Sequence, residues 1–316
     1  MAPAPAAPNR HTMLGVPAPT PPPVITAVLP AELVSLVDPT LRIQDLSRDR
    51  LLMPAPRVQV DKLVVPAVGG IPIFVKLGQG GMGAVYYGVH AQTRSGVAVK
   101  VVPVAAASPE ALENFQTETQ IASTIVSPHL VPVKDQGKQD GLFYIVSEYI
   151  PGVSAGAYLR QATESGDTGL PEAVALDLCI AAAMGLADAH KNGIIHGDIR
   201  PENILIPRRK EDGKLAFKEA RVADLGLPRV EDLGGMLVGS SATIGTPGYM
   251  APEQAADAKA SRKPSDVFSL GATLYALLTG RPPFADDNPM NVIMHTVQTP
   301  HAPVSKMRKD VSPATS

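Results

Sequence analysis

The sequence predicts an α+β protein of two lobes, with a strand-rich first lobe followed by a helix-rich second lobe. The main observation is a change of pattern at Pro151. Over residues 66–150, β-branched and aromatic runs alternate with turn residues, which is typical of strands. Over residues 151–316, the longest segments carry the start and stop signals of helices. Strands and helices segregated in this way along one chain favour an α+β architecture.

Residues 1–65 differ from both lobes. Of the 32 prolines, 12 lie in the first 60 positions, and no aromatic residue precedes Phe74. A segment rich in proline and without aromatic residues buries little surface, so we expect an extended or disordered linker rather than a docking motif. A short helix around residues 31–37 also fits the sequence, because Pro30 suits a helix start.

The elements of the two lobes follow from local signals. Strands are predicted at residues 71–77, 84–89, 96–102, 130–134 and 142–147. Helices are predicted at residues 108–125, 171–191 and 265–278. Ser108 can cap the first helix, and His190 and Lys191 match the dipole at the end of the second. Gly280 follows the third helix, where a left-handed residue usually ends a helix.

Composition narrows the function classes. The net charge of −2 gives no basic field for nucleic acid, so no nucleic-acid partner is expected. Cys179 is the single cysteine, which excludes an intrachain disulfide, and its apolar neighbours indicate a core position. The apolar stretch at residues 173–189 is interrupted by Asp177 and Asp188 and is short for a bilayer. With no leader pattern at the N-terminus, we expect a cytoplasmic protein without a membrane segment in this chain.

A glycine-rich loop lies early in the first lobe, with Gly78, Gly80 and Gly83 at G-x-G-x-x-G spacing. The spacing alone is weak evidence, because it also opens dinucleotide-binding helices. Here the next residues, 84–89, are β-branched and aromatic, so the loop joins two strands. Such a flap can cover phosphates, because glycine lets backbone N–H groups approach them without a Cβ in the way.

Lys100 ends an apolar strand and alternates in phase with Ala98, so both side chains are expected to face the flap. A cation at this place can hold the α- and β-phosphates of a nucleotide, and it needs a carboxylate to orient it. The following helix offers three candidates, Glu110, Glu113 and Glu118.

The clearest chemical pattern consists of Asp198, Asn203 and Asp224, in which Asp224 lies 26 positions after Asp198. Asp198 is expected to accept or orient the proton of an attacking hydroxyl, while Asn203 and Asp224 hold Mg²⁺ through oxygen atoms. The alternative is that these are loop residues that bond their own backbone. Each lies beside an apolar strand, which favours the catalytic interpretation. His196 follows two isoleucines and is expected to be a structural residue rather than a base.

This order of parts resembles the protein kinase catalytic domain, and residues from about 70 to the end are similar to the eukaryotic-type (Hanks-type) Ser/Thr protein kinases of bacteria. Three more segments carry the resemblance: Gly245-Thr-Pro-Gly-Tyr-Met-Ala-Pro-Glu253, Ser265-Asp-Val-Phe-Ser-Leu-Gly271 and Leu278-Thr-Gly-Arg-Pro-Pro-Phe284. The resemblance implies a two-lobed protein-kinase-like fold, ATP and Mg²⁺ as cofactors, and a protein substrate with a Ser or Thr acceptor.

The resemblance also implies an adenine site. Val85 and Ala98 from the first lobe and Leu205 from the second would sandwich the adenine. The hinge between the lobes would run from Glu148 to Ile150.

Further roles follow from the same resemblance. It favours Glu118 as the carboxylate that pairs with the strand lysine. Thr246 would bond Asp198 and Arg200, and Arg200 would neutralise the phosphoryl group in transit. Asp266 would brace the backbone of the catalytic loop.

Three features depart from the family pattern. Gly197 replaces the arginine that, in the family, precedes the catalytic aspartate and binds a phosphate on the activation segment. Phosphorylation of Ser240, Ser241 or Thr243 is therefore not expected to order the activation segment through such an arginine. Arg200 replaces a lysine, which keeps the charge but changes its geometry. The last C-lobe helices of the family, with an arginine expected to pair with Glu253, are not in this sequence.

The leading hypothesis is therefore a Ser/Thr protein kinase that transfers the γ-phosphoryl group of ATP to protein hydroxyls. One alternative is a pseudokinase, a scaffold that binds nucleotide without transfer, which the departures favour. The other is a small-molecule phosphotransferase, because such enzymes often carry His-Gly-Asp in this loop, as here at residues 196–198. The sequence does not predict the substrate protein, the activating signal or the oligomeric state.

Overall fold

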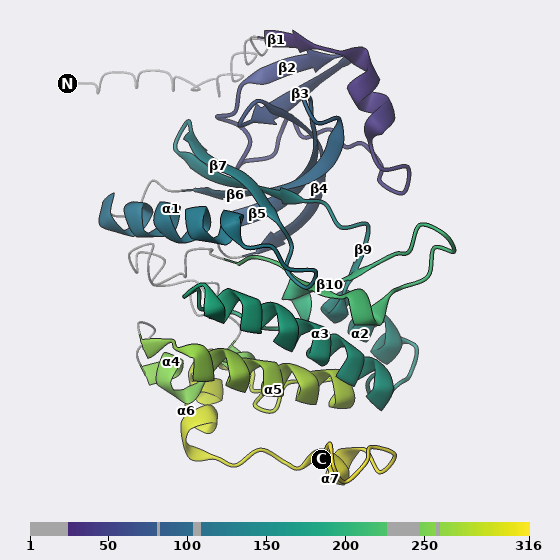
Figure 1. The fold of residues 1–316 in the computed structure, drawn as a ribbon, viewed down its shortest axis with the longest axis vertical. Helices are drawn as coiled ribbons and strands as arrows, with labels where there is room; N and C mark the ends of the chain where they lie inside the picture. Colours follow the sequence, from purple (N-terminus) through teal and green to yellow (C-terminus); the bar gives the residue numbers. More distant parts are fainter. Residues whose placement is uncertain (1–24, 81–82, 104–108, 226–246, 257–259) are drawn as a thin grey trace, which may run out of the picture.

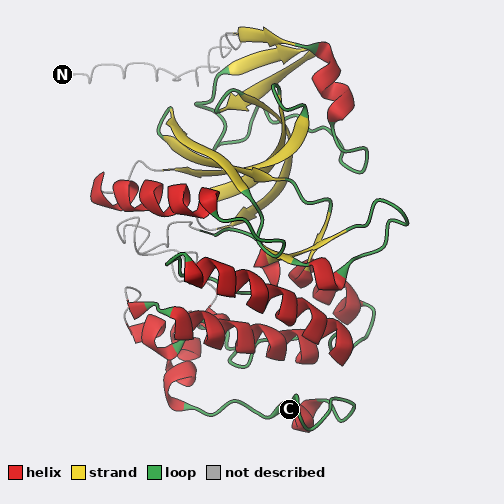
Figure 2. Cartoon of the chain, viewed as in Figure 1, coloured by secondary structure: helices red, strands yellow, loops and turns green. Residues whose placement is uncertain are grey.

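The computed structural model describes residues 25–80, 83–103, 109–225, 247–256 and 260–316. These residues form two lobes, with strands gathered in one and most helices in the other (Figures 1 and 2). The predicted α+β division of the chain is confirmed, and the change from strands to helices falls at residues 148–155.

The N-lobe is built on an eight-stranded sheet with the order β1-β2-β3-β4-β5-β6-β8-β7. Its central strands are β4 (Ile71–Gly80), β5 (Gly83–His90), β6 (Ser95–Pro103), β8 (Leu142–Glu148) and β7 (Val133–Gln139). Helix α1 (Pro109–Thr124) lies against β7. The predicted strands are present, although the one expected at 130–134 begins at Val133, because Leu130 forms a bridge to Val222 of the other lobe instead.

The expectation of an unstructured extension over residues 1–65 is wrong for residues 25–65. They contain β1 (Ile25–Leu29), the 3₁₀ helix η1 (Ala31–Leu36), β2 (Arg57–Val60) and the start of β3 (Leu63–Val68). These strands continue the N-lobe sheet beyond β4, at the end remote from the C-lobe (Figure 1). We call residues 25–68 the folded extension. The short helix expected at 31–37 is η1, while residues 1–24 lie outside the described part of the chain.

Burial explains how a proline-rich segment without aromatic residues can fold. Its aliphatic side chains, among them Leu33, Val58 and Val60, pack on Phe74 and Tyr87 of the central strands. Leu46 and Leu52 pack on the opposite face of the sheet, in a second cluster. The extension therefore uses aromatic residues of the neighbouring strands for its core, and its own composition could not reveal this.

The C-lobe is organised around two packed helices, α3 (Glu172–Lys191) and α5 (Lys263–Thr279). Its other helices are α2 (Ala155–Glu164), α4 (Pro252–Ala256), α6 (Pro289–Gln298) and α7 (Val304–Met307). Gly280 ends α5 with φ of 80°, as expected from its position. Cys179 is buried in α3, which confirms its core position, and burial raises the pKa of its thiol to about 12.

A small sheet faces the N-lobe. It consists of β11 (Arg221–Val222), β10 (Ile204–Pro207) and β9 (Gly152–Ser154) in that order. The 3₁₀ helix η2 (Pro201–Asn203) leads into β10. Because β10 and β11 follow Asp198 and precede Asp224, this sheet sets the positions of the predicted catalytic residues.

Helix α3 is the one helix in the described residues that is long and apolar enough to cross a membrane. Length and composition alone are weak evidence, because core helices satisfy the same criterion. Here Ala175, Leu178, Ala182, Leu186 and Ala189 are buried in the C-lobe core.

Candidate active site

The backbone of the catalytic loop is held by Asp266, which is wholly buried at the start of α5. Its Oδ2 accepts the His196 N–H at 2.9 Å, and its Oδ1 accepts the Gly197 N–H at 2.7 Å. His190 Nε2 lies 2.6 Å from the same Oδ2. The brace implied for Asp266 is therefore present, and it fixes the two residues that precede Asp198.

His196 is a structural residue, as expected, because it is buried and both ring nitrogens are engaged. Its Nδ1 accepts the Asp198 N–H at 3.2 Å, so its Nε2–H is the donor to the Ala223 carbonyl at 2.8 Å. The ring thus links Asp198 to the residue before Asp224. With both nitrogens occupied in this way, His196 has no free position to act as a base.

Gly197 has φ of 72°, a left-handed conformation that glycine adopts without strain. This backbone angle points the Gly197 N–H at Asp266 and its carbonyl at Gln254, whose Nε2 donates at 3.1 Å. The unusual Gly at this position is therefore well suited to the loop.

Asp198, Asn203 and Asp224 are brought together. Asn203 Nδ2 donates to the backbone O of Asp198 at 2.8 Å and to its Oδ2 at 3.1 Å. The Ala223 N–H donates to the Asn203 carbonyl at 2.8 Å, which places Asp224 next to Asn203. Asp224 itself has φ of 65°, a conformation that is uncommon for residues other than glycine and is frequent at functional sites.

Lys100 reaches this cluster from the N-lobe. Its Nζ lies 2.7 Å from Asp224 Oδ2, and both side chains are partly buried. The contact joins β6 to the segment after β11, across the cleft between the lobes. Glu118, the carboxylate implied as the partner of Lys100, is half-buried on α1. The Lys100–Glu118 pair stays a prediction.

The oxygen set fits a small hard cation. The Asn203 amide nitrogen is turned toward Asp198, so the amide oxygen is the atom left for a metal. Asp224 offers a carboxylate next to it, which is a ligand that Mg²⁺ prefers. A cation there would share Asp224 with Lys100.

The pKa of Asp198 is raised. Burial is the main cause, and the positive charges of Arg200 and Lys100, with the hydrogen bond from Asn203, oppose it. The residue is nevertheless exposed to solvent. A carboxylate with a raised pKa is a better proton acceptor, which suits the predicted role.

The glycine-rich loop lies at the end of the β4–β5 hairpin, where Gly78 pairs with Val85 and Gly80 with Gly83. Open space surrounds the Cα atoms of Gly78 and Gly80. Gly83 has φ of 152°, and a Cβ there would lie 2.1 Å from the carbonyl oxygen of Val101. Only glycine therefore fits position 83.

The residues implied for the adenine site lie on strands of both lobes. Val85 is the register partner of Lys100, and Ala98 lies two residues before Lys100, so all three share one face of the sheet. These three residues are half-buried, while their immediate neighbours on β5 and β6 are fully buried. Leu205 lies on β10 of the C-lobe, half-buried. Their contact with adenine stays a prediction.

The hinge residues Glu148 and Ile150 connect β8 to β9. Glu148 Oε1 accepts a hydrogen bond from Arg221 Nη1 at 3.3 Å, which is an ion pair between the lobes. No local pattern predicts this pair, because the two residues are 73 positions apart. The Tyr149 ring packs edge-on against Tyr87, with centroids 4.7 Å apart.

Other residues of the site are placed as follows. Arg200 Nε donates to Glu202 Oε2 at 3.0 Å, and its charge contributes to the field at Asp198. Thr246, with the activation-segment residues Ser240, Ser241 and Thr243, lies outside the described residues. Glu253 has a partner, since the Ser265 hydroxyl donates to its Oε1 at 2.6 Å.

Two residues that hold the loop were missed by the sequence reasoning. His190 was noticed only as a basic residue at a helix end, although it also binds Asp266. Gln254, which binds the Gly197 carbonyl, follows the Ala251-Pro-Glu253 segment directly. Its place directly after that segment was the available signal.

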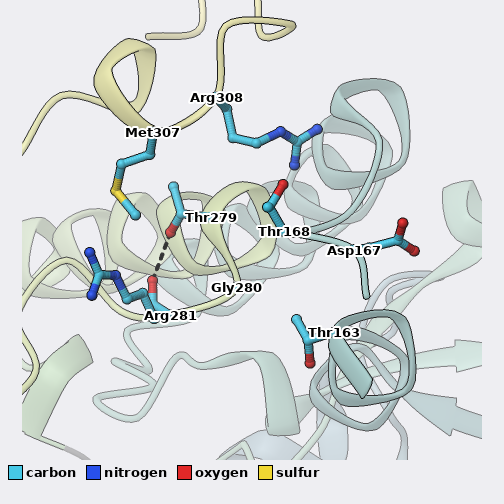
Figure 3. Close-up of a pocket in the computed structure, with 8 residues that line it drawn as sticks. All are labelled: Thr163, Asp167, Thr168, Thr279, Gly280, Arg281, Met307 and Arg308. Atoms are coloured by element: carbon cyan, nitrogen blue, oxygen red, sulfur yellow. Dashed lines mark hydrogen bonds between the residues drawn. The ribbon is translucent and has the colours of Figure 1, made fainter. Parts of the chain in front are cut away.

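One open pocket lies elsewhere, between the end of α5 and the segment around α7 (Figure 3). It is lined by Thr163, Asp167, Thr168, Thr279, Gly280, Arg281, Met307 and Arg308. Figure 3 shows the Thr279 hydroxyl donating to the Arg281 carbonyl, at 2.9 Å. None of its lining residues belongs to the cluster of Lys100, Asp198 and Asp224, so we assign it no part in the chemistry.

Comparisons with known proteins identify the family of this chain. Residues 72–315 match the family described as "Protein kinase domain". The chain is 35% identical over 243 residues to serine/threonine-protein kinase PknB of Mycolicibacterium smegmatis, covering 75% of this chain and 37% of the relative. It is 32% identical over 254 residues to serine/threonine-protein kinase Pkn1 of Myxococcus xanthus, covering 79% and 35%. The chain thus spans little more than a third of the length of these relatives.

Solved structures show the same fold. The crystal structure of the Mycobacterium tuberculosis PknI kinase domain double mutant C20A_R136A superposes with a TM-score of 0.59 at 28% identity. The match covers 77% of this chain and 83% of that one. The family match spans both lobes and includes every residue of the catalytic cluster, so the chain belongs to the protein kinase domain family, in its bacterial Hanks-type Ser/Thr branch.

Proposed function

We propose that this chain is a Ser/Thr protein kinase domain that transfers the γ-phosphoryl group of Mg²⁺-bound ATP to a serine or threonine hydroxyl of a protein. The observation that carries the proposal is the cluster across the cleft, in which Lys100 contacts Asp224 while Asn203 contacts Asp198. Residues from both lobes thus meet at one place, as a shared nucleotide ligand requires. Transfer in this class depends on positioning and charge neutralisation more than on covalent chemistry.

Each side chain has a part in the reaction. The hydroxyl oxygen of the acceptor attacks the γ-phosphorus, the bond from that phosphorus to the β-phosphate oxygen breaks, and the hydroxyl proton passes to Asp198. Lys100 holds the α- and β-phosphates, and Arg200 lies beside Asp198 to offset negative charge. Mg²⁺, held by Asn203 and Asp224, would neutralise the phosphate oxygens.

The pseudokinase alternative has one observation in its favour. In the structure, Lys100 and Asp224 are bonded to each other, so the phosphate-binding cation and a metal ligand neutralise one another. A scaffold that binds nucleotide weakly could rest in this state. Binding and transfer therefore have to be measured separately.

The test compares the wild type with Asp198→Asn, and uses Asp140→Asn as the control. Asp140 lies exposed in the β7–β8 turn, away from the cleft, and its φ of 50° suits asparagine. We expect Asp198→Asn to bind Mg²⁺-ATP as the wild type does in a thermal-shift assay and to lose transfer of labelled phosphate by about 10²- to 10⁴-fold. The control should retain both properties.

The outcomes separate the candidates. Nucleotide binding by the wild type without any transfer to protein would favour the pseudokinase. Full transfer by Asp198→Asn would contradict the role of Asp198. Transfer to small molecules but to no Ser- or Thr-containing protein or peptide would favour a small-molecule phosphotransferase. The cytoplasmic location expected from the sequence stays a prediction.

A further inference from the structure

The folded extension reaches the hairpin that carries the glycine-rich loop. The family match begins at residue 72, so residues 25–68 lie outside it. Gln44 runs beside the outer edge of β4, where its N–H donates to the Phe74 carbonyl at 2.9 Å and its Oε1 accepts the Lys76 N–H at 3.1 Å. The extension therefore occupies the edge of β4 up to two residues before Gly78.

Asp49 of the extension bridges the two strands of that hairpin. Its Oδ2 accepts Lys76 Nζ of β4 at 2.8 Å, and its Oδ1 accepts the Tyr86 hydroxyl of β5 at 2.9 Å. Lys76 and Tyr86 are register partners, so one carboxylate holds both strands at the same level. Gly78 and Gly83, the two ends of the glycine-rich loop, lie two and three residues from this point.

The bridge is protected from solvent. The Asp49 side chain is 8% exposed, and Tyr86 is completely buried. Burial raises the pKa of Asp49, but the hydrogen bonds from Lys76, Tyr86 and the Leu51 N–H outweigh it, so the net pKa is lowered. The carboxylate is thus kept ionised by groups on the hairpin itself. Charge-assisted hydrogen bonds of this kind are stronger than neutral ones.

The extension also contacts the residue behind the hinge. The Tyr87 hydroxyl donates to the Leu36 carbonyl at 3.3 Å and accepts the Asp38 N–H at 3.2 Å. The Tyr87 ring packs against Tyr149, between Glu148 and Ile150. The extension therefore touches the supports of both the phosphate side and the adenine side of the cleft.

We propose that the folded extension is a positioning element of the nucleotide site, in which Asp49 holds the β4–β5 hairpin so that the glycine-rich loop lies at the level where it covers the phosphates. This inference rests on the proposed function, because it assumes that the cleft binds ATP. Asp49 is a positioning residue that touches no nucleotide. Its loss leaves the hairpin attached at its base but free to shift at its tip, which lowers affinity for the phosphates specifically.

The experiment measures the dissociation constants of Mg²⁺-ATP and of adenosine by calorimetry for the wild type, Asp49→Asn and Tyr86→Phe. Asp61→Asn is the matched control, because Asp61 is an exposed carboxylate in the β2–β3 turn of the same extension. Thermal unfolding of each variant verifies that it is folded. Tyr86→Phe removes a single hydroxyl and keeps the ring, which secures a result if Asp49→Asn folds poorly.

We expect the dissociation constant of Mg²⁺-ATP to rise about 3- to 10-fold in Asp49→Asn and less in Tyr86→Phe. A variant with both changes should show little more loss than Asp49→Asn alone, because Tyr86→Phe removes one of the two side-chain contacts that Asp49 makes. Adenosine has no phosphates, so its affinity should stay within about twofold, a difference below 0.5 kcal/mol. Hydrogen exchange of the β4 and β5 amides in the nucleotide-free protein should rise in Asp49→Asn and not in Asp61→Asn.

Three results would overturn the proposal. Unchanged ATP affinity in both variants would show that the bridge does not position the loop. An equal loss of ATP and adenosine affinity would show a general structural role. No binding of either ligand by the wild type would refute the proposed function and, with it, the premise of this inference, whereas the first two results leave the proposed function intact.

Discussion

Two buried carboxylates anchor the segments on the two sides of the proposed nucleotide site, and they do so by different means. Asp266 lies in the core of the C-lobe and accepts two backbone N–H groups of the catalytic loop, together with His190. Asp49 lies in the folded extension and accepts two side chains of the N-lobe hairpin. Asp266 thus anchors backbone atoms and belongs to the region that matches the family. Asp49 anchors side chains and lies outside that region.

The difference has a physical consequence. Backbone atoms held by a wholly buried charge cannot move without leaving that charge unpaired, which is expensive. Side chains such as Lys76 retain rotatable bonds, and the Lys76 side chain is partly exposed. The catalytic loop should therefore be rigid, while the glycine-rich hairpin should be adjustable around a preferred position. The following predictions test this contrast, from the largest expected effect to the smallest.

Replacing Asp266 with asparagine should cause the largest loss. The amide keeps one acceptor oxygen and places an N–H donor against another donor, inside a site with no solvent. We expect the free energy of unfolding to fall by about 3–5 kcal/mol, measured by urea titration with circular dichroism. A decrease in the free energy of unfolding below about 1 kcal/mol is no more than an average hydrogen bond contributes. Such a result would mean that Asp266 does not hold its loop more firmly than Asp49 holds the hairpin.

Leu33→Ala should destabilise the extension. Leu33 is 1% exposed and packs in the cluster formed with Phe74 and Tyr87. Truncation of a buried leucine to alanine lowers the free energy of unfolding by about 2–5 kcal/mol, and we expect this decrease in a urea titration. Val28→Ala is the control, because Val28 is 74% exposed in the same extension and its truncation should have little effect. Equal, small effects of both changes would contradict a packed extension.

Two glycine substitutions should have opposite signs. Gly197→Ala introduces a Cβ at a φ of 72° and should destabilise the protein by about 1 kcal/mol, with slower phosphoryl transfer. Gly271→Ala, in the middle of α5 where an added Cβ meets open space, should stabilise it by about 0.5–1 kcal/mol. Melting temperatures of both variants and of the wild type, measured in parallel, would show the two opposite effects. Stabilisation by Gly197→Ala would refute the requirement for glycine at this position.

The smallest effect concerns pH. The pKa of Asp49 is lowered in the folded protein, below the value of about 3.9 in an unfolded chain. Its stabilising contribution is therefore complete above about pH 4 and is lost as pH falls through the lowered folded pKa. The melting temperatures of wild type and Asp49→Asn should differ at pH 7 and converge in acid. A difference that grows on acidification would mean that Asp49 is not held as a carboxylate.

Sequence reasoning was most successful where chemistry and spacing are local. The run from His196 to Asn203 fixes the distance between Asp198 and its amide partner, because both lie in one loop and the 3₁₀ turn that follows it. The glycine spacing at 78–83 indicates a loop over phosphates only if that loop joins two strands. The β-branched and aromatic residues of β5 predicted the second strand. Such patterns can be recognised because few residues separate the partners.

It was least successful for the extension. Its prolines and lack of aromatic residues indicated disorder, yet Leu33 and Leu52 are buried against strands that come later in the chain. The Asp49–Tyr86 contact joins residues 37 positions apart, and the Glu148–Arg221 pair joins residues 73 apart. No period or motif connects such pairs, since only the packed sheet brings them within reach.

The sequence by itself determined the candidate catalytic groups, their order and the division into a strand-rich and a helix-rich lobe, because these depend on residue type and short-range spacing. Tertiary structure alone decided that Lys100 meets Asp224 across the cleft and that residues 25–68 fold onto the hairpin. The reason is that burial and ion pairing depend on which distant surfaces come together, and a segment can take its hydrophobic core from its neighbours rather than from its own composition.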